Sequence, residues 1–489
     1  MFHLRDLIKS TGAYSIAMLA RRAMGILMLP IYTRLLTPAD YGILEMLDLT
    51  TSMISLLVGM RIGQALFYYH ARAGSSQERA RYISTALWCS LLIGGVAGAA
   101  GVVCAEPLAR LVLGSAQYAG YFRLILWTFS VSLTIETGYC CLRASNALGD
   151  YLRISLVQLG ATVALNLVFM AGLHMGVAGF LWRGLIVQIS LALWLLWKLL
   201  GRGRMALDRR TLAAMLRYSV PLGASGLAMY LINFGDRFFL RHYVSFAELG
   251  IYSLAYRLGM FTSYVQTPFE LYWGSQMFAI VKGPEGDRIN VRVATYMTAV
   301  LAFLAIAIAA FARPIVRLMA GPAYAAGAEF VPWLTLAYVT RTVAGQFRTA
   351  FLLEKKTSQD AVVTASGAAA CLAAYAVLIP WLHVWGAVMA TGIGFGVMFI
   401  VGLRRAQKVR YFAYDFRRLG AIGAVTLAVV TTVTLSHPAA LQMQLLQGAG
   451  LVAGALGLLM FPGALQESEK LFVGDAWRTL RRRWRPLAA

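Results

Sequence analysis

Apolar stretches long enough to cross a bilayer recur along the whole chain, and they constrain the fold more than any other feature. Charged residues make up only 13% of the sequence and apolar residues 59%, whereas charged residues alone form about 25% of a soluble domain. A spanning helix needs about 20 mostly apolar residues. We therefore predict an all-α, polytopic membrane protein with about 14 transmembrane helices. The predicted spans are 12–34, 41–69, 82–104, 119–142, 154–173, 176–197, 218–242, 249–278, 293–312, 327–352, 361–380, 385–403, 419–436 and 443–462.

The basic residues lie mainly on one side of these spans. Of the 44 Lys and Arg residues, 30 fall in the even-numbered connections or the termini, and three fall in the odd-numbered connections. Short cytoplasmic loops carry an excess of Lys and Arg, so both termini are predicted to be cytoplasmic. The net charge of +23 then reflects membrane topology, and no nucleic-acid partner is needed to explain it.

Eleven arginines lie within predicted spans, where each costs about 2.5–3.5 kcal/mol at a helix centre. Four of them lie near span ends, where long side chains can reach the headgroups: Arg34, Arg123, Arg241 and Arg348. The five deepest are expected to face one another, an acid or a hydrated cavity, and they are Arg21, Arg22, Arg61, Arg257 and Arg341. Arg183 and Arg237 complete the set.

The stretch LINFGDRFFLRHY (231–243) places several charges at the end of an apolar helix. We expect Asp236 to neutralise Arg237 or another arginine of the cavity. The alternative is a protonatable switch that releases that arginine during turnover. In either case these charges are expected to line a hydrated interface between two halves of the protein.

Two segments of the chain form an internal repeat. Asp40-Tyr41-Gly42-Ile43 aligns with Glu248-Leu249-Gly250-Ile251, which follows 208 residues later, and each segment opens a long helix. The repeat divides the spans into two parallel six-helix halves, followed by two further helices. Transporters use such parallel repeats, and they hold substrate between the halves near the membrane midplane.

The same segments, LLTPADYGILEM and DRFFLRHYVSFAELGIYSLAYRLG, resemble the polysaccharide-biosynthesis flippases. These are the Wzx-type O-antigen and exopolysaccharide exporters of the multidrug/oligosaccharidyl-lipid/polysaccharide (MOP) superfamily. The resemblance implies two bundles around a central cavity, working by alternating access in a bacterial cytoplasmic (inner) membrane. The implied cargo is an undecaprenyl-pyrophosphate-linked oligosaccharide, moved from the cytoplasmic to the periplasmic leaflet. Polysaccharide assembly proteins are further candidate partners.

The expected organisation has four parts: an N-terminal six-helix lobe at 1–200, a second lobe at 201–410, two helices at 411–465, and a tail at 466–489. The tail places Trp477 and Trp484 among arginines, which is typical of an amphipathic helix on anionic cytoplasmic lipid. A partner-binding tail is the alternative.

An anionic lipid pyrophosphate needs cationic ligands, and arginine holds phosphate oxygens with paired hydrogen bonds. The candidate substrate-binding residues form a cationic cavity: Arg21, Arg22, Arg61, Arg257, Arg341 and Arg348. Charged residues within spans also mark ion pathways. The candidates for gating, or for coupling to a proton or sodium gradient, are Glu45, Asp48, Asp236, Arg237 and Glu270, with Glu136 a further intramembrane acid.

Polar residues also recur at helical spacing within the spans. The polar face at 158–166, formed by Gln158, Thr162 and Asn166, is interpreted mainly as hydrogen bonding between helices.

Nucleotide-binding, catalytic and metal-ligand motifs are absent from the sequence, so no catalytic residue, metal ligand or cofactor is assigned. A lipid II flippase and a multidrug exporter of the same superfamily remain alternatives. A membrane glycan polymerase or ligase is a weaker one, because the predicted periplasmic loops are short.

Overall fold

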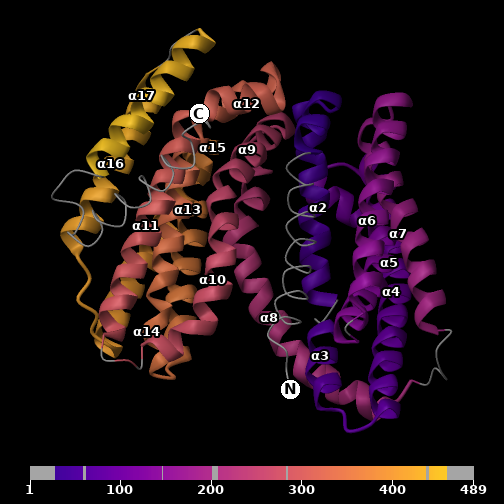
Figure 1. Ribbon diagram of the computed structural model, residues 1–489. Helices are drawn as coiled ribbons and strands as arrows, with labels where there is room; N and C mark the ends of the chain where they lie inside the picture. The colour runs from indigo at the N-terminus through magenta and orange to yellow at the C-terminus, as the bar shows by residue number, and fades with distance from the viewer. Residues whose placement is uncertain are drawn as a thin grey trace, which may run out of the picture. The chain divides into compact units, whose positions relative to one another are not determined.

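The computed structural model describes residues 28–58, 62–145, 147–200, 207–281, 283, 285–436 and 440–459. Every regular element in these ranges is a helix (Figure 1). Eight helices of the described chain are long and apolar enough to cross a membrane. The predicted class, an all-α polytopic membrane protein, is confirmed.

The described residues pack into two compact units. The first contains residues up to Ser253, together with 317–325 and 371–387. Its helices are α2 (Pro38–Val58), α3 (Ile62–Arg72), α4 (Ser76–Leu113), η1 (Ala116–Tyr118), α5 (Ala119–Ala144), α6 (Leu148–Asn166), the π-helical η2 (Leu167–Gly172), α7 (Gly176–Leu200), α8 (Arg209–Leu240) and the first part of α9 (Phe246–Gly259).

The second unit contains residues 254–316, 326–370 and 388 onward. The helices that begin after α9 are α10 (Phe261–Ile280), α11 (Gly286–Ala310), α12 (Ala312–Ala320), η3 (Pro322–Glu329), α13 (Val331–Gln346), α14 (Arg348–Leu353), α15 (Thr357–Val409), α16 (Phe416–Leu435) and α17 (Leu441–Leu459). Segments of α12, η3 and α15 belong to the first unit. The lobe boundaries at residues 200 and 410 stay predictions.

The predicted spans coincide with helices wherever the structure describes them, but some differ in continuity. The span predicted at 249–278 is divided between α9 and α10, and the span at 327–352 between α13 and α14. Conversely, the spans at 361–380 and 385–403 both lie in α15. They are separated there by a kink with non-helical angles at His383, shortly after Pro380. This break falls in the connection that we predicted between the two spans, and Arg405 donates to Gln359 across it at 2.5 Å, so the two halves of α15 fold back on each other.

The two repeat segments begin their helices with the same hydrogen-bonded arrangement. The backbone N–H and hydroxyl of Thr37 donate to the Asp40 carboxylate at 3.2 and 2.7 Å, and the Asp40 N–H donates back to the hydroxyl at 3.1 Å. Ser245 and Glu248 form the equivalent bonds at 2.9, 2.8 and 3.2 Å. Each pair is a capping box, which satisfies backbone donors that an isolated helix start leaves free.

The glycines of the same two segments let the helix starts approach each other closely. A Cβ placed on Gly42 would lie 2.0 Å from the carbonyl oxygen of Phe246, and one on Gly250 would lie 2.0 Å from that of Pro38. Only glycine fits at either position without moving the backbone. The sequence repeat therefore encodes a pair of equivalent caps and a close crossing between α2 and α9.

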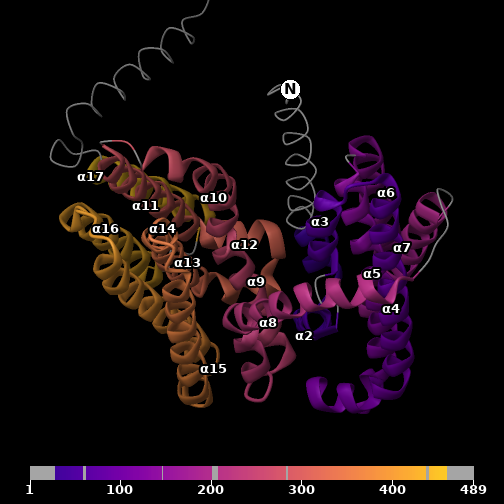
Figure 2. The ribbon, with the colours of Figure 1, turned by 90° about the horizontal axis from the view of Figure 1, so that it is seen from below.

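Each unit has its own packed core. In the first, α4 packs along α5, α5 packs against α7, and α2 packs against α8. In the second, α11 contacts α13, α16 and α17 (Figure 2). Ile306 of α11 packs there with Val429 of α16 and Ala455 of α17.

The polar face predicted at 158–166 does join helices. The hydroxyl of Tyr139 donates to Gln158 at 2.7 Å, and the Asn166 amide donates to the Tyr32 hydroxyl at 2.9 Å. These bonds connect α6 to α5 and to the helical residues 28–35. The structural interpretation of this face is confirmed.

Candidate functional site

A buried ion cluster lies where α2, α8 and α9 meet within the first unit, and we define it by Glu45, Asp236, Arg237 and Tyr252. Arg237 Nη1 lies 2.8 Å from Asp236 Oδ1, and Arg237 Nε lies 3.6 Å from Glu45 Oε1. The hydroxyl of Tyr252 donates to the second oxygen of Asp236. The Arg237 guanidinium also lies over the rings of Phe234 and Tyr252, at 5.5 and 5.3 Å from their centroids.

This cluster is buried, which corrects the prediction of a hydrated interface at Asp236 and Arg237. Both residues are 0% exposed, and Glu45 is 4% exposed. The sequence pattern shows charges at the end of an apolar helix but does not show that Glu45, nearly 200 residues earlier, meets them. Because the charges pair with one another, they can stay buried without water. Their pairing favours the structural interpretation of Asp236.

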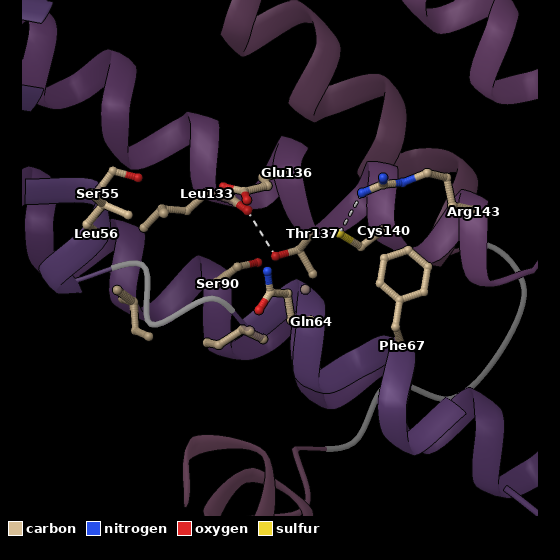
Figure 3. Close-up of a pocket in the computed structure, with 13 residues that line it drawn as sticks. Ser55, Leu56, Gln64, Phe67, Ser90, Leu133, Glu136, Thr137, Cys140 and Arg143 are labelled. Carbon is tan, nitrogen blue, oxygen red and sulfur yellow. Dashed lines mark hydrogen bonds between the residues drawn. The ribbon is translucent and has the colours of Figure 1, made fainter. Parts of the chain in front are cut away.

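A second polar site in the first unit is an open pocket of about 540 Å³. Four helices line it: α2 through Ser55, α3 through Gln64 and Phe67, α4 through Ser90, and α5 (Figure 3). The volume falls within the roughly 300–1,000 Å³ typical of small-ligand sites. We call it the polar pocket.

Helix α5 supplies most of the polar groups of this pocket. Leu133, Glu136, Cys140 and Arg143 follow one another at intervals of three, four and three residues, so they share one helix face. Figure 3 shows the side chains of Glu136 and Arg143 in the pocket, with Arg143 beside Phe67. The Arg143 guanidinium lies 5.0 Å from the centroid of that ring and 3.3 Å from Cys140 Sγ.

Within the part of the chain that the structure describes, the charges of the polar pocket have no charged partner, unlike those of the ion cluster. Glu136, Arg143 and Gln64 are exposed side chains. No ion pair within 4.0 Å engages Glu136 or Arg143 among the residues that the structure describes. An exposed guanidinium, carboxylate and amide can therefore contact an incoming ligand, with donors for phosphate oxygens and acceptors for hydroxyl groups.

The pocket hydroxyls of Thr137 and Ser90 are held by their own helices. Thr137 donates to the carbonyl of Leu133 at 3.0 Å, and Ser90 donates to that of Leu87 at 2.8 Å. Each hydroxyl oxygen can still accept a hydrogen bond.

Most of this pocket was not predicted from the sequence. We assigned Arg143 to a cytoplasmic connection, because the predicted span ended at residue 142, whereas α5 continues to Ala144. Glu136 was noted only as an intramembrane acid, and Gln64 was not noted. The spacing from Leu133 to Arg143 was the available signal, and extending the helix by half a turn would have revealed it.

The remaining predicted site residues are spread over both units or lie outside the described chain. Arg21, Arg22, Arg61 and the tail at 466–489 lie outside it. Asp48 is exposed on α2 of the first unit, and Arg257 is exposed on α9 in the second. In the first unit, the structure brings together Glu45, Asp236 and Arg237 from the candidate lists.

Three predicted residues lie near one another in the second unit. The guanidinium of Arg341 lies 5.8 and 5.5 Å from the ring centroids of Tyr338 and Phe395. Glu270 accepts a hydrogen bond from Gln266 at 2.6 Å and lies within electrostatic range of Arg341 and Arg348. Arg348 also forms a 2.9 Å ion pair with Asp360, with 59% of the Arg348 side chain exposed.

Comparison with solved structures shows the fold of the chain. The chain is similar to the lipid II flippase MurJ in an inward closed conformation, with a TM-score of 0.67 and 12% identity, covering 91% of this chain and 98% of that one. It is also similar to an inward-facing multidrug resistance MATE family transporter of the MOP superfamily, with a TM-score of 0.62 and 17% identity, covering 83% and 99%. The outward-facing conformation of a MATE family transporter gives 0.57 and 17%, covering 85% and 96%. The chain therefore has the MOP transporter fold.

A sequence comparison then identifies the family. The family model described as polysaccharide biosynthesis protein matches residues 7–269, more than half of the chain. The chain therefore belongs to the polysaccharide biosynthesis protein family, as the sequence motifs predict. None of the curated proteins compared with it matches significantly in sequence.

Proposed function

We propose that this protein is a flippase for a polyprenyl-pyrophosphate-linked oligosaccharide. It moves this lipid by alternating access from the cytoplasmic to the periplasmic leaflet of a bacterial inner membrane, with both of its termini in the cytoplasm. Membership of the polysaccharide biosynthesis family and a fold shared with a lipid flippase support the reaction class. A transporter role also accounts for apolar helices along the whole chain in a sequence without a catalytic motif.

The observation that carries the proposal is the polar pocket. Its position fits the cytoplasmic half of the membrane, since Arg143 lies at the end of α5 that the distribution of basic residues predicts to be inside. Arg143 can donate to pyrophosphate oxygens, and Glu136 and Gln64 can accept from sugar hydroxyls. A headgroup that is both anionic and rich in hydroxyls can hydrogen-bond to all three of these side chains.

The predicted cationic residues of the second unit extend this proposal. Arg341 and Arg257 remain candidates for stabilising the pyrophosphate during translocation, because buried phosphate needs compensating charge. We expect Arg257→Ala or Arg341→Ala to abolish translocation while leaving membrane insertion and folding largely intact. Arg288, which is 78% exposed in a surface pair with Glu285, provides the control Arg288→Ala.

The experiment uses proteoliposomes that contain the purified full-length protein and a polyprenyl-pyrophosphate oligosaccharide. A membrane-impermeant glycosidase reports which leaflet holds the lipid, with and without a proton or sodium gradient. Protein-dependent movement that Arg341→Ala abolishes and Arg288→Ala preserves would support the proposal and its cationic path. Movement of lipid II or of a cationic drug, with no movement of the oligosaccharide lipid under either gradient, would replace it with one of the alternative transport functions.

A further inference from the structure

The first unit also contains an apolar groove, which we define by the side chains that α2, α4 and α5 contribute to it. The groove has a volume of about 490 Å³. Its α4 wall includes Val96, Ala100, Cys104 and Leu108, and it is closed by Ile54 and Val58 of α2 and by Leu126 and Phe129 of α5. Exposed apolar side chains are ordinary on a membrane protein, but a concave groove indicates that a chain can lie in it.

The apolar groove continues directly from the polar pocket. Ile93 of α4 lines both cavities. On α5 the groove ends at Phe129 and the pocket begins at Leu133, one helical turn later. The two cavities together form one track whose polar part lies at one end and whose apolar part leads away from it along α4.

The length of the groove distinguishes its occupant from an ordinary membrane lipid. It follows α4 from Leu92 to Leu108, which corresponds to about 24 Å at 1.5 Å per residue. The hydrocarbon core of a bilayer is about 30 Å thick, so one leaflet provides only about 15 Å. A phospholipid acyl chain fills one leaflet, whereas a polyprenyl chain is long enough to fill the whole groove.

We propose that the apolar groove binds the polyprenyl chain of the substrate while the polar pocket binds its pyrophosphate-sugar head. This inference rests on the proposed function for the identity of the lipid. The short side chains of Ala97 and Ala100 leave room for the methyl branches of an isoprenoid. Binding both ends of the lipid selects long-chain carriers over soluble sugar phosphates and over phospholipids.

A native cysteine can report whether this groove is occupied. Cys104 lines the groove and is exposed, whereas the other four cysteines are buried. A small apolar maleimide should therefore react with Cys104 in nanodiscs, with the modified peptide read by mass spectrometry. We expect undecaprenyl pyrophosphate to slow this reaction and geranyl pyrophosphate, which has the same head, to leave it unchanged. Equal protection by both lipids, or by neither, would overturn the proposal.

A substitution that fills the groove tests its contribution to affinity. Ala100→Trp places a large side chain in the groove at an exposed position, and Ala99→Trp is the matched control, exposed on the same helix but outside the groove. We expect the wild type and the control to bind undecaprenyl pyrophosphate at least about tenfold more tightly than the geranyl compound, because of the apolar area buried. Ala100→Trp should lose that preference while still binding the geranyl compound.

The outcomes separate this inference from the proposed function. If Ala100→Trp keeps the full chain-length preference, the groove proposal is wrong even where flipping occurs. If the preference and the Cys104 protection are present but no oligosaccharide lipid is flipped, the groove stands and the proposed transport reaction fails. Thermal unfolding of both tryptophan variants verifies that each is folded.

Discussion

The buried ion cluster and the polar pocket use the same chemical groups in opposite environments. In the cluster, Arg237 lies 2.8 Å from Asp236 and both residues are 0% exposed. In the pocket, Arg143 and Glu136 are both exposed, without an ion pair among the described residues. The difference teaches that charge within a membrane helix does not by itself mark a binding site. Paired, buried charges stabilise the helix packing, whereas exposed charges are available to a ligand.

The largest effect is expected from breaking the buried ion cluster. Arg237→Met leaves two buried carboxylates without this guanidinium, and losing one partner of a buried ion pair costs about 3–5 kcal/mol. We expect a marked loss of monodisperse protein and a lower unfolding temperature in detergent. Arg110→Met, in an exposed pair with Glu106, is the control. If the Arg237 variant were as stable as the wild type, the buried ion cluster would not stabilise the helix packing.

A milder change at the cluster separates stability from switching. Asp236→Asn removes one charge and keeps the shape, with the Arg237 guanidinium still 3.6 Å from Glu45. We expect a smaller loss of stability and near-normal flipping in the folded fraction. A stable variant that cannot flip lipid would support the alternative in which Asp236 is a protonatable switch.

At the polar pocket, we expect Arg143→Gln to lower flipping by at least about tenfold, because it removes a charge-assisted phosphate donor. Stability should change by no more than about 0.5 kcal/mol, as at other exposed positions. The measurements are the glycosidase assay and thermal unfolding on the same preparation. Unfolding of this variant would show that Arg143 stabilises the first unit. The charges of the polar pocket would then be structural, like those of the ion cluster.

Glu136→Gln tests whether the carboxylate repels the pyrophosphate. It should have a smaller effect on ligand binding than Arg143→Gln. Removing a carboxylate from a site that binds pyrophosphate reduces repulsion between like charges. We therefore expect sugar-free polyprenyl pyrophosphate to bind a few-fold more tightly, as measured by titration in nanodiscs. Weaker binding of this sugar-free lipid would mean that Glu136 holds a cation or orients Arg143.

The smallest effect is expected at Arg110, whose side chain is 67% exposed in its pair with Glu106. Exposed ion pairs contribute about 0–1 kcal/mol, so Arg110→Gln should change neither the unfolding temperature nor flipping appreciably. A large transport defect here would show that exposure does not separate functional from neutral arginines in this protein.

The helices were predictable from the sequence because each span is a local apolar pattern of sufficient length. The capping boxes at Thr37 and Ser245 are also local, because each is formed by residues three positions apart at the start of a repeat segment. The break at His383 also falls where the sequence predicted it, between the spans 361–380 and 385–403.

The site was harder to predict because it depends on contacts between distant segments. Sequence spacing placed Asp236 and Arg237 together but did not show that Glu45 completes their cluster. The polar pocket combines single residues from α2, α3 and α4 with a face of α5. No single helix contributes enough polar residues to identify the pocket from the sequence. The residues of the apolar groove cannot be distinguished in the sequence from ordinary lipid-facing residues.

The most direct test is the affinity of the full-length protein in nanodiscs for undecaprenyl pyrophosphate, compared between Arg143→Gln and Arg110→Gln. Both variants remove one exposed guanidinium from the first unit, but only Arg143 lines the polar pocket. We expect Arg143→Gln to bind at least about tenfold more weakly, and Arg110→Gln to bind as the wild type does. Equal affinities for the two variants would contradict the assignment of the polar pocket as the headgroup site.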